Sequence, residues 1–281
     1  MQLAKFLCIF NCYDNDLRKV LYWHSHEPVV PKFYPSEIEN FITIRSVTPE
    51  TIAVNIDGSN RPAVRVGWAY STLGPVWASI KPADLGMHGI LAEVPLPVYI
   101  QSHAIMRLLE RVDCFLSGVA QMNIYESLIS PTITYDQNHK LLIEYSVFKT
   151  KIGYFRADIV DGIILIRTFL FITNSGTPEG DLLEKNLGLQ KSDKQYLAID
   201  KLSTFMNSDL DTNLIAQQLF IDSGCQCLID VYFKLKPIAF KKENITKFNF
   251  MLSYINTHKE NTDLNEKDSL IEKDKKEWAL A

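Results

Sequence analysis

The chain has 281 residues, of which 47% are hydrophobic and 22% are charged, and its formal net charge is −4. This composition excludes an intrinsically disordered chain, because the hydrophobic share is large enough to build a core. The acidic balance excludes a broadly basic surface for nucleic acid, so any site for a polyanion has to be a local concentration of Arg and Lys.

The five cysteines predict reduced thiols in a cytoplasmic protein, because their number is odd and they form no disulfide framework. Neither Cys8 with Cys12 nor Cys225 with Cys227 has the two-residue gap of a zinc knuckle, so we expect no metal and no cofactor. The short apolar run near the N-terminus leads into Asp14 rather than a small-residue cleavage site. No hydrophobic run reaches the roughly 18 residues that span a bilayer, and we therefore expect no membrane association.

The first third of the chain has the residue composition of β-strands. It is rich in β-branched and aromatic residues, and Asp57-Gly58 is typical of a hairpin turn. A segment with three prolines and two glycines, 81–98, then reads as a connection and as a boundary between domains. We predict an N-terminal β-rich region over residues 1–98 with strands at 42–45, 51–56, 63–70 and 75–80.

A helix is predicted over residues 100–126, with Ser102 as its N-cap. Hydrophobic side chains recur on one side of this helix at helical spacing, and ionisable side chains share the other side. The hydrophobic side is formed by Ile105, Leu108, Leu109, Val112, Phe115, Leu116 and Val119.

A second set of strands follows Pro131, at 132–135, 140–148, 152–160 and 163–173. The connections between them are short, which forces antiparallel neighbours, and the almost entirely apolar last strand is expected to be central. Further helices are predicted after residue 176, where Thr177 is an N-cap and Pro178 the first helical residue, and then over 193–206 and 210–222. The segment 227–235 fits a strand or a helix equally.

Together these elements predict an α+β protein. We expect antiparallel β meanders, a long amphipathic helix packed on the second sheet, and additional C-terminal helices. Residues 99–255 are expected to form the second domain and residues 256–281 a charged tail, because core-forming residues become sparse there.

Common catalytic signatures do not occur in the sequence. The phosphate-binding Gly-Lys-Ser/Thr loop, the dinucleotide Gly-x-Gly-x-x-Gly pattern, Gly-x-Ser-x-Gly and His-Glu-x-x-His are all missing. Their absence argues against the usual ATPases, dehydrogenases, serine hydrolases and zinc proteases.

The helical pattern His103-Ala-x-x-Arg107-x-x-Glu110-Arg111, leading into a strand meander, resembles the toxin-type nucleases of the barnase/EndoU/colicin/RelE-like superfamily. The resemblance covers residues 100–175. It implies a metal-independent ribonuclease of the bacterial toxin or mobile-element type, with helices packed against a four-stranded antiparallel sheet and RNA as its partner.

RNA cleavage without a metal requires a base, an acid and cations that hold the phosphate. We expect His103 and Glu110 to share the catalytic roles and Arg107 and Arg111 to bind phosphate, because guanidinium groups grip it through two hydrogen bonds. Three cations of the meander are expected to extend this binding surface, namely Lys149, Lys151 and Arg156.

A different interpretation explains the same residues. Arg107, Glu110 and Arg111 are also spaced as an ordinary ladder of ion pairs on a solvated helix. The chain is then a non-enzymatic protein-interaction or scaffold module, with a partner protein in place of RNA. What separates the two interpretations is whether the polar helix side lines a concavity or faces open solvent.

Overall fold

The structure is a computed structural model that describes residues 50–56, 58–71, 74–114, 117–235 and 247–257. The predicted strand at 42–45 and all but two residues of the predicted tail lie outside the described residues. The chain divides into two compact units, residues 1–172 with 201–203, and residues 173–200 with 204–281. The predicted α+β class is confirmed, because helices and a largely antiparallel sheet are both present.

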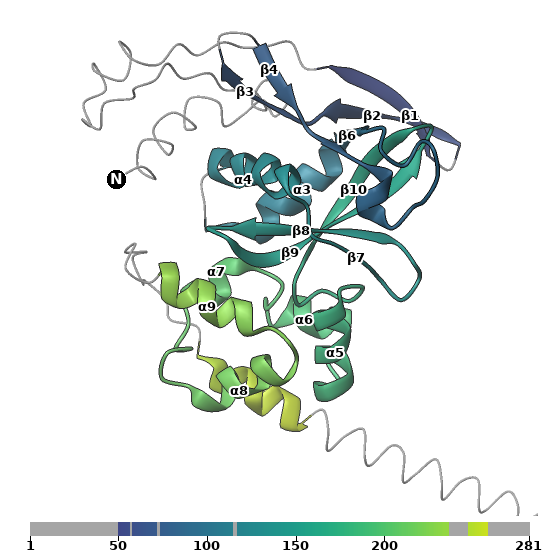
Figure 1. Cartoon of the computed structure of the whole chain (residues 1–281). Helices are drawn as coiled ribbons and strands as arrows, with labels where there is room; N and C mark the ends of the chain where they lie inside the picture. The colour runs from purple at the N-terminus through teal and green to yellow at the C-terminus, as the bar shows by residue number, and fades with distance from the viewer. Residues whose placement is uncertain (1–49, 57, 72–73, 115–116, 236–246, 258–281) are drawn as a thin grey trace, which may run out of the picture. The chain divides into compact units, whose positions relative to one another are not determined.

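The described strands of the first unit form one eight-stranded sheet and a separate two-stranded ladder (Figure 1). The eighth strand of this sheet, β5 (Ser79–Ile80), pairs with β6 outside the main order. The two-stranded ladder consists of β3 (Gly67–Ser71) and β4 (Gly74–Trp77). The main order is β1 (Thr51–Ile56), β2 (Ser59–Arg65), β6 (Leu96–Gln101), β10 (Ile163–Phe171), β9 (Thr150–Val160), β8 (Leu141–Val147) and β7 (Ile133–Tyr135).

Strand β6 joins the two sets of strands that the sequence suggested were separate. It pairs antiparallel with β2 and parallel with β10, so the expected connection over 81–98 contains a central strand. Its residues Val98, Tyr99 and Ile100 are all buried, so no polar alternation marks the strand in the sequence. Pro97 was taken as a break, although a proline at the beginning of a strand costs the ladder little.

The second meander has the predicted strands, each within two residues of its expected bounds, but the turn expected at 149–151 lies at Phe148-Lys149. Val147 pairs with Thr150, and Val160 pairs with Ile163, which leaves two residues in each hairpin turn. These turn residues, Phe148-Lys149 and Asp161-Gly162, all have positive φ, as the tight two-residue hairpin requires. β10 lies between β6 and β9, so the prediction of a central last strand is confirmed.

The single helix expected over 100–126 is two helices, α3 (Ser102–Arg111) and α4 (Ser117–Ile129). The first ends where the Asp113 carboxylate accepts hydrogen bonds from the backbone N–H and hydroxyl of Ser203, at 3.0 and 2.7 Å. Because these bonds join residues 90 positions apart, helical periodicity alone does not predict them. The N-cap is Gln101, not the predicted Ser102.

Aromatic rings fill the space between the sheet and these helices. Tyr145, Phe155 and Phe169 are fully buried and meet edge to face, with ring centroids 5.2 to 5.7 Å apart. Glu126 of α4 and Cys114, just after α3, lie close enough to add to the raised pKa of Tyr145, whose main cause is burial. The aromatic face is therefore the face that α3 and α4 cover, and Ala104, Ile105 and Leu108 are the buried residues of α3.

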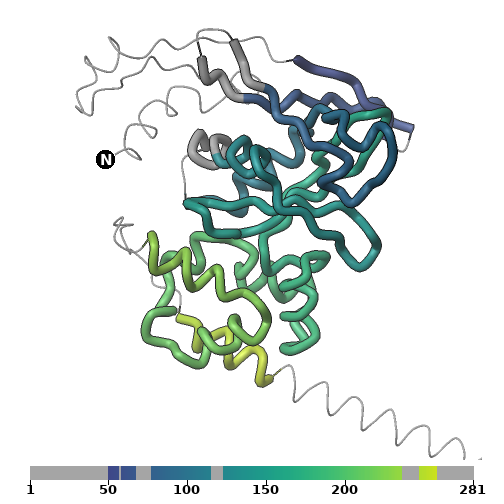
Figure 2. The backbone as a smooth tube through the Cα atoms, viewed as in Figure 1, coloured from purple at the N-terminus to yellow at the C-terminus, as the bar shows by residue number. Residues whose placement is uncertain are grey.

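The second unit is helical in its described residues (Figure 2). The predicted N-cap of α5 is confirmed, because the Thr177 hydroxyl accepts a hydrogen bond from the N–H of Gly180 at 2.9 Å. The ambiguous segment 227–235 is helical, and Phe205, Phe220 and Phe248 form a buried ring cluster. The helices are α5 (Pro178–Leu187), α6 (Lys191–Tyr196), α7 (Leu202–Met206), which starts in the first unit, α8 (Leu214–Asp222), α9 (Gln226–Leu235) and residues 248–257.

Candidate functional site

Three of the seven predicted site residues share the exposed side of α3. His103, Arg107 and Glu110 are all exposed, and Arg107 and Glu110 form an ion pair of 2.6 Å with 44% and 51% of their side-chain surfaces accessible. They occupy the helix side opposite the buried Ala104, Ile105 and Leu108. None of them lines the one pocket described below. An exposed pair of this kind is strongly solvated, so its charges exert little force on a ligand.

Arg111 does not join that group. Its guanidinium donates a hydrogen bond of 2.5 Å to the backbone carbonyl of Phe169, which lies in β10. The side chain is partly buried and ties the end of α3 to the central strand. The residue expected to hold phosphate thus has a structural partner.

Two of the strand cations project from the other face of the sheet. Because neighbouring strand residues point to opposite faces, Arg156 points away from the aromatic face to which Phe155 belongs. Arg156 lies 3.3 Å from the buried carboxylate of Asp136. Lys151 donates to the Tyr154 hydroxyl at 3.0 Å and lies 3.5 Å from Glu144, on the Tyr154 side of the sheet.

The structure therefore brings together His103, Arg107 and Glu110, but it does not bring the strand cations to them. Lys151 and Arg156 each lie beside a carboxylate, and Arg111 lies against a backbone carbonyl. Sequence spacing placed three of the four helix residues on one exposed side correctly. The partners of Arg111 and Arg156 come from strands distant in sequence.

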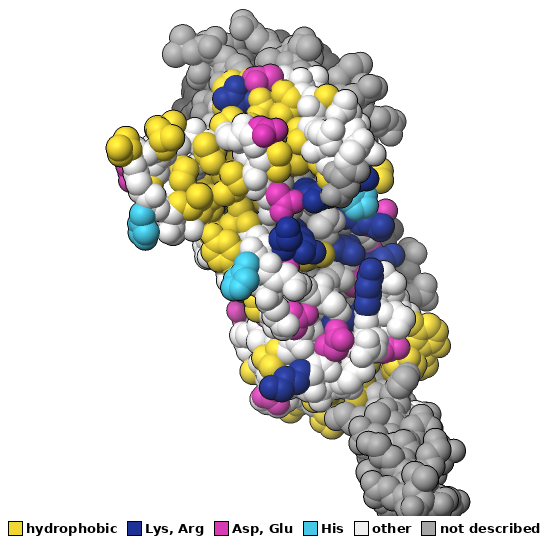
Figure 3. Space-filling model, turned by 90° about the vertical axis from the view of Figure 1, so that its right-hand side faces the viewer, with side chains coloured by type: hydrophobic (Ala, Val, Ile, Leu, Met, Phe, Trp, Pro, Cys, Tyr) yellow, Lys and Arg dark blue, Asp and Glu magenta, His cyan; other side chains and the backbone are white. Residues whose placement is uncertain are grey.

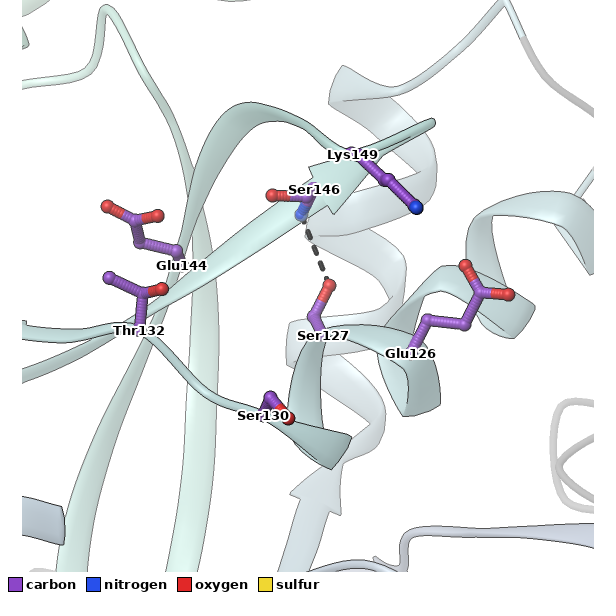
Figure 4. Close-up of a pocket in the computed structure, with 7 residues that line it drawn as sticks. All are labelled: Glu126, Ser127, Ser130, Thr132, Glu144, Ser146 and Lys149. Atoms are coloured by element: carbon purple, nitrogen blue, oxygen red, sulfur yellow. Dashed lines mark hydrogen bonds between the residues drawn. The ribbon is translucent and has the colours of Figure 1, made fainter.

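Lys149, the last of the seven, lines a polar pocket of about 180 Å³ between the end of α4 and strand β8 (Figure 4). The Ser127 hydroxyl accepts a hydrogen bond from the N–H of Ser146 at 3.1 Å and so closes the floor of this pocket. Partial burial raises the pKa of Glu126, and the nearby Lys149 opposes that rise. The lining residues are Glu126, Ser127, Ser130, Thr132, Glu144, Ser146 and Lys149.

A surface that the sequence analysis missed lies in the segment between the short 3-10 helix η2 (Pro82–Leu85) and β6. Residues 86–95, called the apolar loop here, expose four large hydrophobic side chains. Met87 is 48% accessible, Ile90 99%, Leu91 73% and Val94 51%. On the face drawn in Figure 3, exposed hydrophobic side chains gather in a broad area rather than being scattered. The signal available in the sequence was the apolar pair Ile90-Leu91 directly after Gly89, in a segment that no strand or helix pattern claims.

The apolar loop is held by hydrogen bonds along its length. Ala83 donates from its N–H to the carbonyl of Ala92 at 2.9 Å, which closes the loop at its base. Lys81 and Glu93 form an ion pair of 2.9 Å, and the Tyr135 hydroxyl donates to the carbonyl of Leu85 at 2.8 Å. Gly86 has φ 74, a left-handed conformation that glycine adopts without strain. The exposed side chains thus stand on an ordered backbone.

Metal-binding and membrane-spanning features can be assessed only for the described part of the chain. Within it, no three His, Cys, Asp or Glu side chains are grouped as metal ligands, and no helix is long and apolar enough to cross a membrane. Cys114, Cys225 and Cys227 are not joined in disulfides there, and Cys8 and Cys12 lie outside the described residues. Comparison with known proteins found no matching family model, curated protein or solved structure.

Proposed function

We propose that the chain is a non-enzymatic protein-interaction module that binds its partner through the apolar loop. The observation that carries the proposal is the exposure of Ile90 (99%) and Leu91 (73%) on a hydrogen-bonded loop. Large apolar side chains grouped on a protein surface mark interaction sites, because water solvates them poorly until a partner covers them.

The charges around the loop favour a protein over RNA or an anionic membrane. Asp84 and Glu93 are acidic and exposed, and Lys81 already pairs with Glu93. A phosphate backbone or an anionic lipid surface would be repelled by this rim, whereas a partner with an apolar centre and basic edges is complementary to it.

The test is affinity capture from a native lysate with wild type and the variant Ile90→Ser/Leu91→Ser. A matched control is Leu214→Ser/Ile215→Ser, which changes two hydrophobic residues of α8 that are 72% and 67% exposed. We expect the same proteins on the wild type and the control and their loss from the loop variant. Identical retention by all three proteins would overturn the proposal.

RNA cleavage is the second candidate function. It is supported by the shared exposure of His103, Arg107 and Glu110 on one helix side and by the resemblance of that pattern to toxin-type nucleases. If RNA is the substrate, these three residues must bind and cleave it without Arg111, Lys151 and Arg156, whose partners are described above. Incubation of the purified protein with total RNA in EDTA, wild type against His103→Ala, tests this candidate directly.

A further inference from the structure

Strand β1 is an edge strand whose outer side has no partner strand in the part of the chain that the structure describes (Figure 1). Its six residues pair with β2 without a bulge, and none of them is charged or a proline. Proteins usually protect such an edge with charges, prolines, bulges or a very short strand, because its unpaired backbone groups can bind another strand. The opposite edge of the sheet is protected in this way, because β7 has only three residues and begins just after Pro131. β1 is therefore the edge that a further strand can extend.

Alternate residues of β1 direct their backbone groups to this outer edge. The N–H of Arg65 in β2 donates to the carbonyl of Glu50 at 2.9 Å, and bonded pairs alternate with non-bonded pairs along antiparallel strands. The even-numbered residues of β1 therefore bond to β2, whereas the odd-numbered residues direct their N–H and C=O groups outward. The odd-numbered residues are Thr51, Ala53 and Asn55, and their side chains are exposed.

The side chains of the even-numbered residues lie on a hydrophobic face of the sheet. Val54 and Ile56 belong to a buried cluster with Tyr99 and Leu165, and Ile52 packs against that cluster. A strand added at the edge has to continue this face, because a slip by one residue would turn its hydrophobic side chains to the opposite side.

A second copy of β1 meets both requirements when it runs antiparallel to the first with Ala53 on the two-fold axis. Ala53 then faces Ala53, and Thr51 of each copy faces Asn55 of the other, so all the outward-facing residues enter hydrogen-bonded pairs. On the hydrophobic face, Ile52 of one copy lies opposite Val54 of the other. No like charges meet within the paired strands, because β1 contains no charged residue. The strand is thus complementary to itself in backbone, hydrophobic face and charge.

We propose that the chain forms a two-fold symmetric dimer in which two β1 strands join the sheets of two copies into one continuous sheet. This surface is separate from the apolar loop, and the proposal does not depend on the partner of that loop. A single strand pair is small beside the roughly 1,200–2,000 Å² that stable interfaces bury, so the dimer is in a concentration-dependent equilibrium with the monomer.

The experiment is sedimentation velocity of the full chain at concentrations from about 1 μM to 1 mM, the range of weak specific association. We expect the wild type to change from monomer to dimer as its concentration rises. Ala53→Pro removes the N–H that points to the second copy and leaves the bonds to β2 in place, so this variant should stay monomeric throughout. Ala53→Val is the matched control, because it keeps the N–H, and it should dimerise at least as tightly as the wild type.

Charge at the same position tests the register. Ala53→Lys and Ala53→Glu each place like charges opposite each other in the dimer, whereas an equal mixture of the two variants places opposite charges there. The mixture should associate about fivefold or more tightly than either variant alone. Thermal unfolding of each variant checks that it is folded.

A wild type that remains monomeric up to about 1 mM would overturn the proposal, and this is the result expected if another segment of the chain or a different protein covers β1. A dimer that persists in Ala53→Pro would overturn it too, because the contact would then lie elsewhere. A mixture that associates no more tightly than the single variants would contradict the register with Ala53 on the axis. Ile90→Ser/Leu91→Ser should dimerise as the wild type does, and loss of the dimer in this variant would assign self-association to the apolar loop instead.

Discussion

Arg111 of α3 donates its hydrogen bond to the carbonyl of Phe169, 58 residues further along the chain, while Arg107 on the same helix faces solvent. Two arginines one helical turn apart thus have different roles. Replacing Arg111 with Ala should lower the free energy of unfolding by about 1–3 kcal/mol, because a partly buried carbonyl loses its charged donor. Arg107→Ala is the matched control and should cost only about 0.2–1 kcal/mol, the range of an exposed ion pair. Urea denaturation of both variants measures the difference, and equal losses would contradict the assigned roles.

RNA binding provides the second prediction. If the apolar loop is the functional surface, Arg107→Ala and the wild type should retard a single-stranded RNA equally little at low salt. If Arg107 contacts a phosphate, Arg107→Ala should instead bind RNA more weakly than the wild type. The salt dependence of the variant's affinity should then be smaller by about one released counterion. Electrophoretic shifts at two salt concentrations distinguish these outcomes, with Arg107→Lys separating charge from bidentate geometry.

Close packing between β9 and β10 leads to the third prediction. A Cβ atom on Gly153 would lie 2.6 Å from the Phe169 ring and closer still to the Leu170 carbonyl, so the backbone would have to move. Gly153→Ala should therefore destabilise the first unit by about 1–3 kcal/mol, as overpacking of a core does. The control Gly162→Ala, with φ 76 and open space around it, should lose only about 1 kcal/mol from backbone conformation. A higher midpoint temperature of thermal unfolding for Gly153→Ala than for Gly162→Ala would refute this packing.

The fourth prediction concerns pH and the side chains around Glu50. Tyr99 and Arg65 donate hydrogen bonds to the Glu50 carboxylate at 2.6 and 2.8 Å and lower its pKa. Burial, and then the bond to Glu50, raises the pKa of Tyr99 to about 12. The Glu50 contribution to stability is present above the ordinary carboxyl pKa and is lost as pH falls through the lowered value. The Tyr99 contribution is present below about pH 10 and is lost as pH rises through about 12.

Glu50→Gln removes the anion but keeps the shape of the side chain. Because Glu50 is 44% exposed, we expect the variant to be less stable at pH 7 by less than about 1 kcal/mol. The difference between variant and wild type should shrink as the pH is lowered toward 3. Urea titrations at several pH values measure it, and a difference that grows on acidification would have the wrong sign for this hydrogen-bonded carboxylate.

The elements that the sequence predicted well are those specified by neighbouring residues. The Asp161-Gly162 turn and the Thr177 cap depend on residues a few positions apart, and both lie where they were expected. β6 and the break after Arg111 depend instead on partners far along the chain, which no local pattern specifies.

The same distinction applies to the candidate site. Helical spacing placed His103, Arg107 and Glu110 on one side, but it could not show that Asp136 would lie beside Arg156. That pair depends on the β7–β8–β9 register, which pairing across the sheet determines. The apolar loop was missed because the turn residues around it marked a connection, and only the folded structure shows which of its hydrophobic residues stay exposed.

The most direct test of the interaction function is the affinity of the purified partner, once captured, for the wild type and for Ile90→Ser/Leu91→Ser. Isothermal titration calorimetry should show binding weakened at least about thirtyfold by the loop variant, which corresponds to the about 2 kcal/mol of a hot-spot residue. The Leu214→Ser/Ile215→Ser control should bind as the wild type does. A loop variant that binds its partner with wild-type affinity while remaining folded would contradict the assignment of the apolar loop as the interaction surface.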